Sequence, residues 1–278
     1  MKQFLSFFLW GSVITSALVC VLTSCQPSEE KCAETLLLTA QQQFVGGNLN
    51  AARLTIDSLH STYPKQVAIR RRADTLVWRI DLKEITRTQP YLDSMIAESS
   101  KKNEQLLKNF KFYKDERYQD VGSYEHQLMQ AANNTGRSYL KPITDEQGNF
   151  SFMAQYVGGK INFTSLTVTI DGLSSDTGEA DEDCRNSYDN QGVHRETALF
   201  TEEIVGDVAR FIANNVGHKI TVTFNGSSAR SVVMTARDVE IFAQTYDLSV
   251  ALSDAYHLQR QLQNNMKRLE ILNQRLNP

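Results

Sequence analysis

The sequence has no excess of basic residues. Its 278 residues include 29 Lys and Arg against 32 Asp and Glu, which gives a formal net charge of -3 at pH 7. Nucleic-acid binding depends on Lys and Arg that neutralise phosphates, so this balance disfavours a DNA- or RNA-binding protein. Proline and glycine are few, 5 and 14, and hydrophobic residues make up 41% with a mean hydropathy of -0.37. These values exclude a disordered chain and a polytopic membrane protein, and the length fits one or two folded domains.

Motifs of catalytic and metal sites are also missing. The sequence contains no Gly-x-Ser-x-Gly elbow, no Gly-x-x-x-x-Gly-Lys phosphate loop, no Gly-x-Gly-x-x-Gly turn and no Cys-x-x-Cys pair. The densest group of carboxylates, between Asp176 and Asp189, lacks the glycine and final glutamate of a calcium loop, so we interpret it as a solvated acidic loop. The five histidines are isolated, which is more typical of surface or capping residues than of metal ligands: His60, His126, His194, His218 and His257. We therefore expect no catalytic residue, no metal and no cofactor, although a site assembled from distant residues would leave no motif.

One long hydrophobic run is present, from Phe4 to Leu22, and it follows the positive charge of Lys2. This order of a short basic region and an apolar region is typical of a secretory signal peptide. The run is just long enough to cross a bilayer, so an uncleaved signal anchor is the alternative.

The four residues Leu22-Thr23-Ser24-Cys25 at the end of this run resemble the lipobox of bacterial lipoproteins. The resemblance implies that residues 1–24 are removed as a signal peptide and that Cys25 becomes the first mature residue, modified with acyl chains such as palmitate. Two or more acyl chains hold a protein stably at a membrane without a spanning helix. Gln26 occupies the position where an aspartate resembles an inner-membrane retention signal, so the resemblance favours the outer membrane, facing the periplasm or the cell surface.

Two cysteines remain after Cys20 and Cys25 are assigned to the signal and the lipid. Cys32 lies near the expected anchor, at the end of a linker over 25–32, and Cys184 lies far away in the acidic segment. An oxidising envelope compartment would allow them to form a disulfide, but nothing in the sequence indicates that they meet, and two separate thiols are the alternative.

Residues 33–65 predict two helices joined by Gly46-Gly47-Asn48. Small and apolar residues occur at the spacing of a tetratricopeptide-like repeat: Ala40, Ala52, Ile56, Leu59 and Pro64. The segment resembles one such repeat, but no second helical pair follows at the same offset, and solenoids need about three repeats. An ordinary helical hairpin is the simpler interpretation.

Two longer segments, 66–113 and 237–277, predict helices with heptad patterns, the first with a break or kink at Gln89-Pro90 and a new start capped by Thr88. In the first segment one stripe comprises Leu82, Gln89, Ile96, Asn103 and Phe110, and the other comprises Ile85, Leu92, Ser99, Leu106 and Tyr113. In the second segment one stripe comprises Leu248, Ala255, Leu262, Leu269 and Leu276, and the other comprises Leu252, Gln259, Met266 and Asn273. Because the two patterns are of similar length and flank a different kind of sequence, we expect an antiparallel coiled coil; packing on the central domain or on a second copy is the alternative.

The central segment, 115–236, changes from helical to alternating periodicity. Strands are predicted at 150–157 and 165–170, separated by Gly158-Gly159, and at 219–224 and 231–234, joined by a tight turn at Asn225-Gly226. One helix starting at Thr201 is predicted between these pairs, with Val208 and Ile212 on its apolar face. We expect a small antiparallel β-rich domain with one helix.

The sequence thus predicts an α+β protein with an N-terminal helical hairpin, an antiparallel coiled coil and an inserted β-rich domain. Together with the lipobox it favours an outer-membrane lipoprotein with a non-catalytic binding or scaffold role. Its expected partners are the membrane, through the lipid, and another envelope protein, with self-association through the coiled coil as a further option. An envelope hydrolase or a glycan-binding accessory protein is the alternative, which a concave pocket lined by carboxylates or aromatic residues in 115–236 would favour and a flat sheet face would disfavour.

Overall fold

The computed structural model describes residues 28–130, 133–134, 136–190 and 192–277. It contains helices and antiparallel sheets, so the expected α+β class is confirmed at this level. The chain divides within its longest N-terminal helix into two compact units, one up to Ile80 and one from Asp81. Cys25 lies outside the described residues, so its lipidation stays a prediction.

The first unit comprises α1 (Glu29–Val45), α2 (Leu49–Thr62) and the start of α3 (Val67–Leu106). The turn between α1 and α2 requires Gly47, whose φ of 81° favours glycine. Small and branched side chains from the three helices form one buried cluster, which includes Ala33, Leu37, Ala40, Ala52, Ile56, Leu59, Ala73 and Ile80. Arg72 in α3 pairs with Glu34 in α1 at 2.8 Å, so polar contacts as well as apolar packing hold this unit together.

The helix α3 differs from its prediction at two places. It continues through Pro90, although proline has no N–H for the carbonyl of Thr86, and the Thr88 hydroxyl donates to the Glu84 carbonyl instead of capping a new helix. The predicted helix over 66–113 is wrong at its end, because Phe110–Tyr113 is a strand. Its aromatic residues fit a heptad and a strand equally well, and pairing with a distant strand decides between the two.

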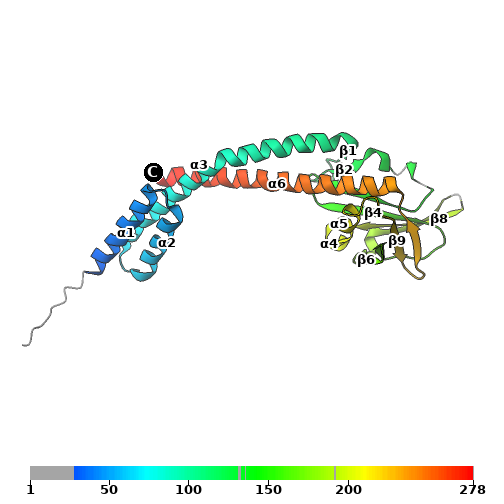
Figure 1. Cartoon of the computed structure of the whole chain (residues 1–278), viewed down its shortest axis with the longest axis horizontal. Coiled ribbons are helices and arrows are strands. Elements are labelled where there is room, and N and C mark those ends of the chain that lie inside the picture. The colour runs from blue at the N-terminus through cyan, green and yellow to red at the C-terminus, as the bar shows by residue number, and fades with distance from the viewer. Residues whose placement is uncertain (1–27, 131–132, 135, 191, 278) are drawn as a thin grey trace, which may run out of the picture. The chain divides into compact units, whose positions relative to one another are not determined.

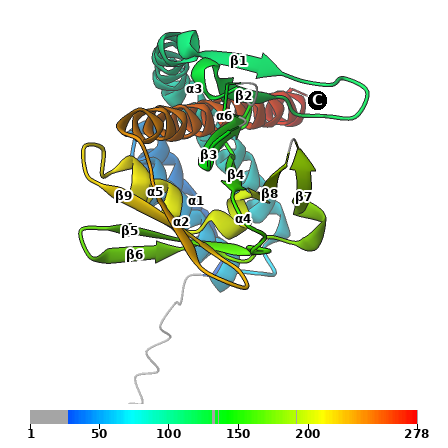
Figure 2. The same cartoon turned by 90° about the vertical axis from the view of Figure 1, so that its right-hand side faces the viewer.

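The second unit is built around two antiparallel sheets (Figures 1 and 2). The six-stranded sheet has the order β1-β2-β3-β4-β8-β7, and the four-stranded sheet has the order β10-β9-β5-β6. The strands of the larger sheet are β1 (Phe110–Tyr113), β2 (Ser123–His126), β3 (Tyr139–Asp145), β4 (Phe150–Val157), β7 (Arg185–Asn190) and β8 (Val193–Phe200). Those of the smaller sheet are β5 (Ser165–Ile170), β6 (Leu173–Asp176), β9 (Ile220–Asn225) and β10 (Arg230–Val233).

The main core lies between these sheets, as in a β-sandwich. Figure 2 shows β5 and β6 below β3 and β4. Alternate residues of β4, β5, β8 and β9 point into one buried cluster. Phe152 of β4 stacks on Phe200 of β8 with ring centroids 5.1 Å apart, and Phe163 meets Phe224 of β9 edge to face at the same distance. Both sheets therefore contribute their largest side chains to the same interior.

One predicted turn needs correction. β9 and β10 pair as expected, but they are joined through residues 225–229, because Phe224 lies opposite Arg230. β4 and β5, which Gly158-Gly159 separates in the sequence, belong to different sheets. The two-residue turn is instead Asp171-Gly172, with φ of 49° and 84°, between β5 and β6. Gly226 is required for close packing, because a Cβ there would lie 2.2 Å from the carbonyl oxygen of Ile161.

The predicted helix after Thr201 is split by Gly206 into α4 (Glu202–Val205) and α5 (Val208–Ala213). Gly206 has a φ of 57°, which interrupts a regular helix. Val208 and Ile212 are fully buried in the main core, so the apolar face of α5 is confirmed. The acidic segment is more ordered than a loop, because it contains the end of β6, the 3-10 helix η4 (Glu182–Cys184) and β7.

The C-terminal helix α6 (Ala236–Leu276) begins at Thr235, whose hydroxyl accepts from the N–H of Asp238 at 3.1 Å. It packs against β3 and α5 and contributes Phe242 to the main core. The second predicted stripe is correct at Leu252, which is buried, but wrong from Gln259 onwards: Met266 is 60% exposed, whereas Leu272 is 5% exposed. The apolar side of α6 therefore contains the first stripe and the residues three positions after each of its members. This is the a-to-d spacing of a heptad, whereas the predicted second stripe lies four positions after the first.

Candidate functional site

Within the second unit α3 and α6 run side by side in opposite directions (Figure 1). At one end Leu106 of α3 packs against a cluster that contains Leu248 and Leu252 of α6. Towards the other end Arg268 of α6 donates a hydrogen bond to Asp81 of α3 at 3.1 Å. The two contacts fix the antiparallel direction of this helix pair.

The predicted stripes of α3 are its less exposed side in this unit. Ile85 and Leu92 are buried, and Leu82, Ile96 and Leu106 are half-buried. The helical periodicity of the sequence therefore identifies the side of α3 that is turned towards protein.

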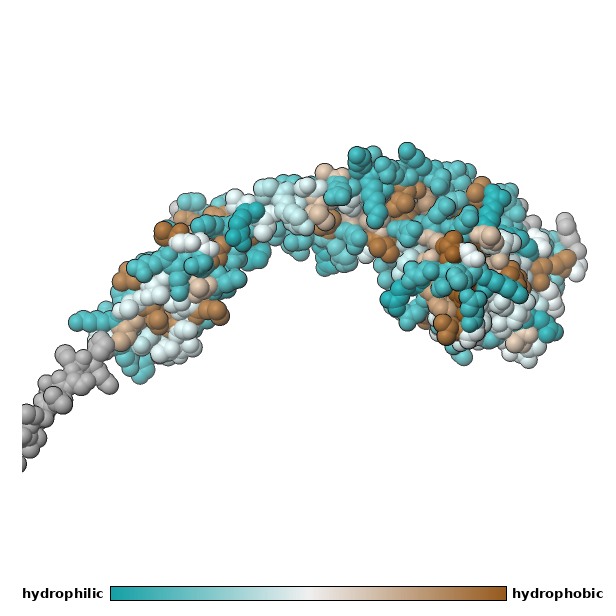
Figure 3. Space-filling model, in the orientation of Figure 1, coloured by the Kyte–Doolittle hydropathy of each residue, from teal (hydrophilic) through white to brown (hydrophobic). Residues whose placement is uncertain are grey.

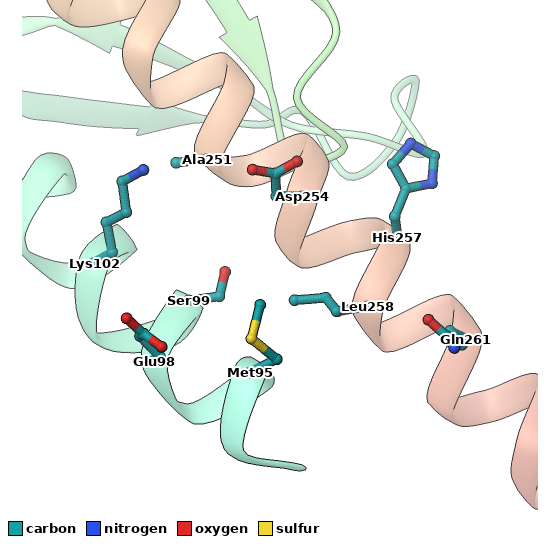
Figure 4. Close-up of a pocket in the computed structure, with 9 residues that line it drawn as sticks. All are labelled: Met95, Glu98, Ser99, Lys102, Ala251, Asp254, His257, Leu258 and Gln261. Carbon is teal, nitrogen blue, oxygen red and sulfur yellow. The ribbon is translucent and has the colours of Figure 1, made fainter. Parts of the chain in front are cut away.

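Between the two contacts the helices leave an opening of about 450 Å³, which we call the α3–α6 groove. Its lining is drawn in Figure 4: Met95, Glu98, Ser99 and Lys102 from α3, and Ala251, Asp254, His257, Leu258 and Gln261 from α6. Lys102 lies near Ala251 at one end of the groove, and Met95 lies near Leu258 towards the other. A space of this size exceeds a packing defect and is typical of a binding site.

The groove combines an apolar centre with charged edges. Met95 and Leu258 contribute apolar surface, while Glu98 and Lys102 on α3 and Asp254 on α6 contribute charges of both signs. One helical turn before Met95, Tyr91 is 71% exposed. Over the face visible in Figure 3, hydrophobic side chains otherwise occur in small patches among hydrophilic ones.

Two polar residues of the α3 stripes lack a complete set of partners. The side-chain oxygens Oε1 of Gln89 and Oδ1 of Asn103 are buried and have no hydrogen-bond partner among the described residues. A buried acceptor without a donor costs about 1–3 kcal/mol. Sequence periodicity locates both residues, but their unmet acceptors emerge only from the structure.

Away from the groove, the carboxylate of Glu196 in β8 is bound by three consecutive backbone N–H groups. It accepts hydrogen bonds from the backbone N–H groups of Ile161 at 2.7 Å, Asn162 at 3.0 Å and Phe163 at 3.0 Å. Burial alone would raise the pKa of Glu196, but these N–H donors and the ring of His194 outweigh it and place the pKa below that of an ordinary glutamate. Glu196 thus holds the crossover from β4 to β5 against the larger sheet.

Beside Glu196, three residues of the β7–β8 hairpin resemble a nucleophile, a base and an orienting acid. His194 places Nε2 3.3 Å from Ser187 Oγ and Nδ1 2.9 Å from Asp189 Oδ1. The same Nε2 lies 3.3 Å from Glu196 Oε1. A ring nitrogen that donates to Glu196 cannot accept the proton of Ser187, which weakens this set as a catalytic triad. No sequence motif predicts this set, because the distances between the three side chains depend on how β7 and β8 pair in the hairpin.

A third polar cluster joins the segment just before β3 to α6. The Arg137 guanidinium donates to both carboxylate oxygens of Asp238, one at 2.8 Å, and to Asn134. Burial alone would raise the pKa of Asp238, but the hydrogen bonds from Arg137 and Thr235 place it below its usual range. The charges of Arg137 and Asp238 are paired with each other, so we interpret this ion pair as a structural link to α6.

The remaining predicted positions are not brought together. Cys32 lies in α1 of the first unit and Cys184 in η4 of the second, both partly exposed thiols, and their pairing stays a prediction. His60 and His218 each face one aspartate, Asp74 at 3.2 Å and Asp171 at 2.6 Å. Among the described residues no group of three or more His, Cys, Asp or Glu could hold a metal ion.

Comparisons of the chain with protein-family models, with curated proteins and with solved structures find no match. Within the described ranges no helix is both long and apolar enough to cross a bilayer.

Proposed function

We propose that this chain is a cell-envelope lipoprotein with a non-catalytic binding or scaffold role. In this proposal α3 and α6 form an antiparallel coiled-coil stalk that carries the β-sandwich. The observation that supports it most is the α3–α6 groove, a sizeable opening with an apolar centre and charged edges between two long helices. The interior of the sandwich is filled by aromatic and branched side chains. An opening of equal volume beside Arg137 and Asp238 is lined mainly by polar side chains, and these two residues already bond each other.

The N-terminal part of the proposal concerns α1 and α2, which we propose to act as a tetratricopeptide-like helical hairpin. Ala40, Ala52, Ile56 and Leu59, the residues at the repeat spacing, are all buried in the cluster of the first unit. Small residues at these positions allow close helix packing. Exposed Leu38 and Leu54 would add a second apolar surface for a partner.

Lipidation at Cys25 is tested by its replacement. A Cys25→Ala variant has no thiol for acylation, so we expect incorporation of labelled palmitate into the chain to be lost. A Cys20→Ala variant is the matched control and should incorporate label like the wild type. Label retained by Cys25→Ala would contradict the lipoprotein assignment.

The binding role is tested by cross-linking living cells that express a tagged full-length chain, followed by mass spectrometry of the products. We expect one dominant envelope protein, or the chain itself, to be linked through residues 91–102 or 251–261. Links distributed over the whole surface without a preferred partner would contradict the proposed role.

An envelope hydrolase or glycan-binding accessory protein is our second candidate, and the Ser187–His194–Asp189 geometry is the observation that favours the hydrolase. Labelling of the chain by a fluorophosphonate probe, lost in Ser187→Ala and kept in Ser174→Ala, would favour the hydrolase over the scaffold.

A further inference from the structure

The α3–α6 groove lies on a surface large enough to form a specific interface. From Asp81 to Leu106, α3 is about 39 Å long at 1.5 Å per residue, and two helices of about 10 Å diameter give a face about 20 Å wide. Such a face covers about 800 Å², which matches the area that one partner contributes to a standard protein interface. An additional pair of helices would therefore cover it well.

The groove carries charges of both signs, which favours an identical partner. Glu98 and Asp254 are acidic, and Lys102 is basic, with His257 beside them. An anionic lipid or a basic peptide would match only one sign of charge. A second copy can match both, because a two-fold interface pairs each residue with a different residue of the same set.

We propose that a second copy of this chain occupies the α3–α6 groove, with its own α3 and α6 completing an antiparallel four-helix bundle. This inference rests on the binding role proposed above and names its partner. With a two-fold axis parallel to the helices, α3 of one copy packs on α6 of the other. Because this rotation preserves helix direction, every neighbouring pair of helices in the bundle is antiparallel. Bundles of this kind are a stable arrangement for amphipathic helices.

This symmetry predicts specific contacts. Figure 4 shows Lys102 at the level of Ala251, which is one helical turn from Asp254. Rotation about an axis parallel to the helices does not move a residue along the helix direction, so equivalent residues of the two copies lie at the same height. Lys102 of each copy therefore meets Asp254 of the other, and Glu98 lies towards His257. Met95 and Leu258, the large apolar residues of the groove, become buried against their equivalents.

Charge reversal with cross-complementation tests the interface. Two full-length copies with different affinity tags are co-expressed, extracted in detergent and purified through one tag, and the recovery of the other is measured. We expect Lys102→Glu in both copies, or Asp254→Lys in both, to reduce recovery at least tenfold, because like charges then meet twice. Combining one Lys102→Glu copy with one Asp254→Lys copy should restore recovery, because opposite charges meet at both positions.

Matched controls are Lys101→Glu on α3 and Glu270→Lys on α6, which change the charge equally at exposed positions outside the groove. Both should recover like the wild type. Restoration by the mixed pair also shows that each variant folds. The inference is overturned if wild-type copies do not co-purify, if single reversals behave like the controls, or if the mixed pair fails to recover. A different envelope protein cross-linked at the groove would in that case leave the binding role intact.

Discussion

Replacing Phe242 by alanine is expected to lower the free energy of unfolding of the second unit by about 3–5 kcal/mol. Phe242 is fully buried, and its ring lies 5.3 Å from that of Phe150 and 5.8 Å from that of Phe152. Both phenylalanines belong to β4, at the centre of the larger sheet. Alanine at position 242 would leave a cavity where α6 enters the sandwich, so the loss combines apolar burial with unfilled space.

Hydrogen exchange followed by mass spectrometry separates this effect from the rest of the chain. Peptides that cover 150–157 should exchange faster in Phe242→Ala, whereas peptides that cover 52–59, in the first unit, should be unchanged. Met266→Ala, at a 60% exposed position of the same helix, is the control and should change stability by about 0.5 kcal/mol or less. Equal protection of 150–157 in both variants would mean that α6 docks without Phe242.

Local patterns in the sequence predict the elements of this unit better than their partners. β5 and β9 alternate buried and less buried residues throughout, and β4 does so up to Ala154, because one face of each strand points to the core. This alternation is visible in the sequence. β4 pairs with β8 and β5 with β9, and each of these partners is far away along the chain. No turn sequence encodes such pairings, so local patterns do not show that β4 and β5 lie in different sheets.

Two strands carry too little signal to be predicted. β7 (Arg185–Asn190) is an exposed edge strand and has no apolar face, so its sequence looks like a loop. β1 contains Phe110, which is buried, and Phe112 and Tyr113, which are 46% and 42% exposed. Pairing with β2 creates the strand, and this pairing depends on a turn that local periodicity does not describe.

The candidate site was predictable only in part. The heptad pattern of α3 identifies the side turned towards protein, and the extent of α6 agrees with its prediction within one residue at each end. The groove itself depends on how far apart the two helices run between Leu106 and Asp81, and this separation is set by their contacts at both ends. A single helix sequence does not contain that distance.

The role of Glu196 could not be predicted from the sequence either, and its replacement is expected to reduce stability strongly. Its partners are backbone N–H groups of Ile161, Asn162 and Phe163, which any residue type would provide, so only the fold reveals them. Glu196→Gln is expected to lower the free energy of unfolding at pH 7 by about 3 kcal/mol, because hydrogen bonds to a charged group contribute about 1.5–3 kcal/mol each and the amide NH₂ meets N–H donors. Glu182→Gln, at an exposed acid that lines one opening together with Glu196, is the control and should change stability little.

The pH dependence distinguishes this role from simple loss of packing. Because the pKa of Glu196 is lower in the folded chain than in the unfolded one, its contribution to stability is complete above the unfolded value of about 4.3 and is lost as the pH falls through the folded value. The stability difference between the wild type and Glu196→Gln should therefore be largest near pH 7 and shrink below about pH 4. Urea unfolding of both proteins across this range measures it. A difference that stays constant with pH would mean that the N–H groups at 161–163 do not need the negative charge, and that side-chain shape at position 196 holds the crossover between the sheets.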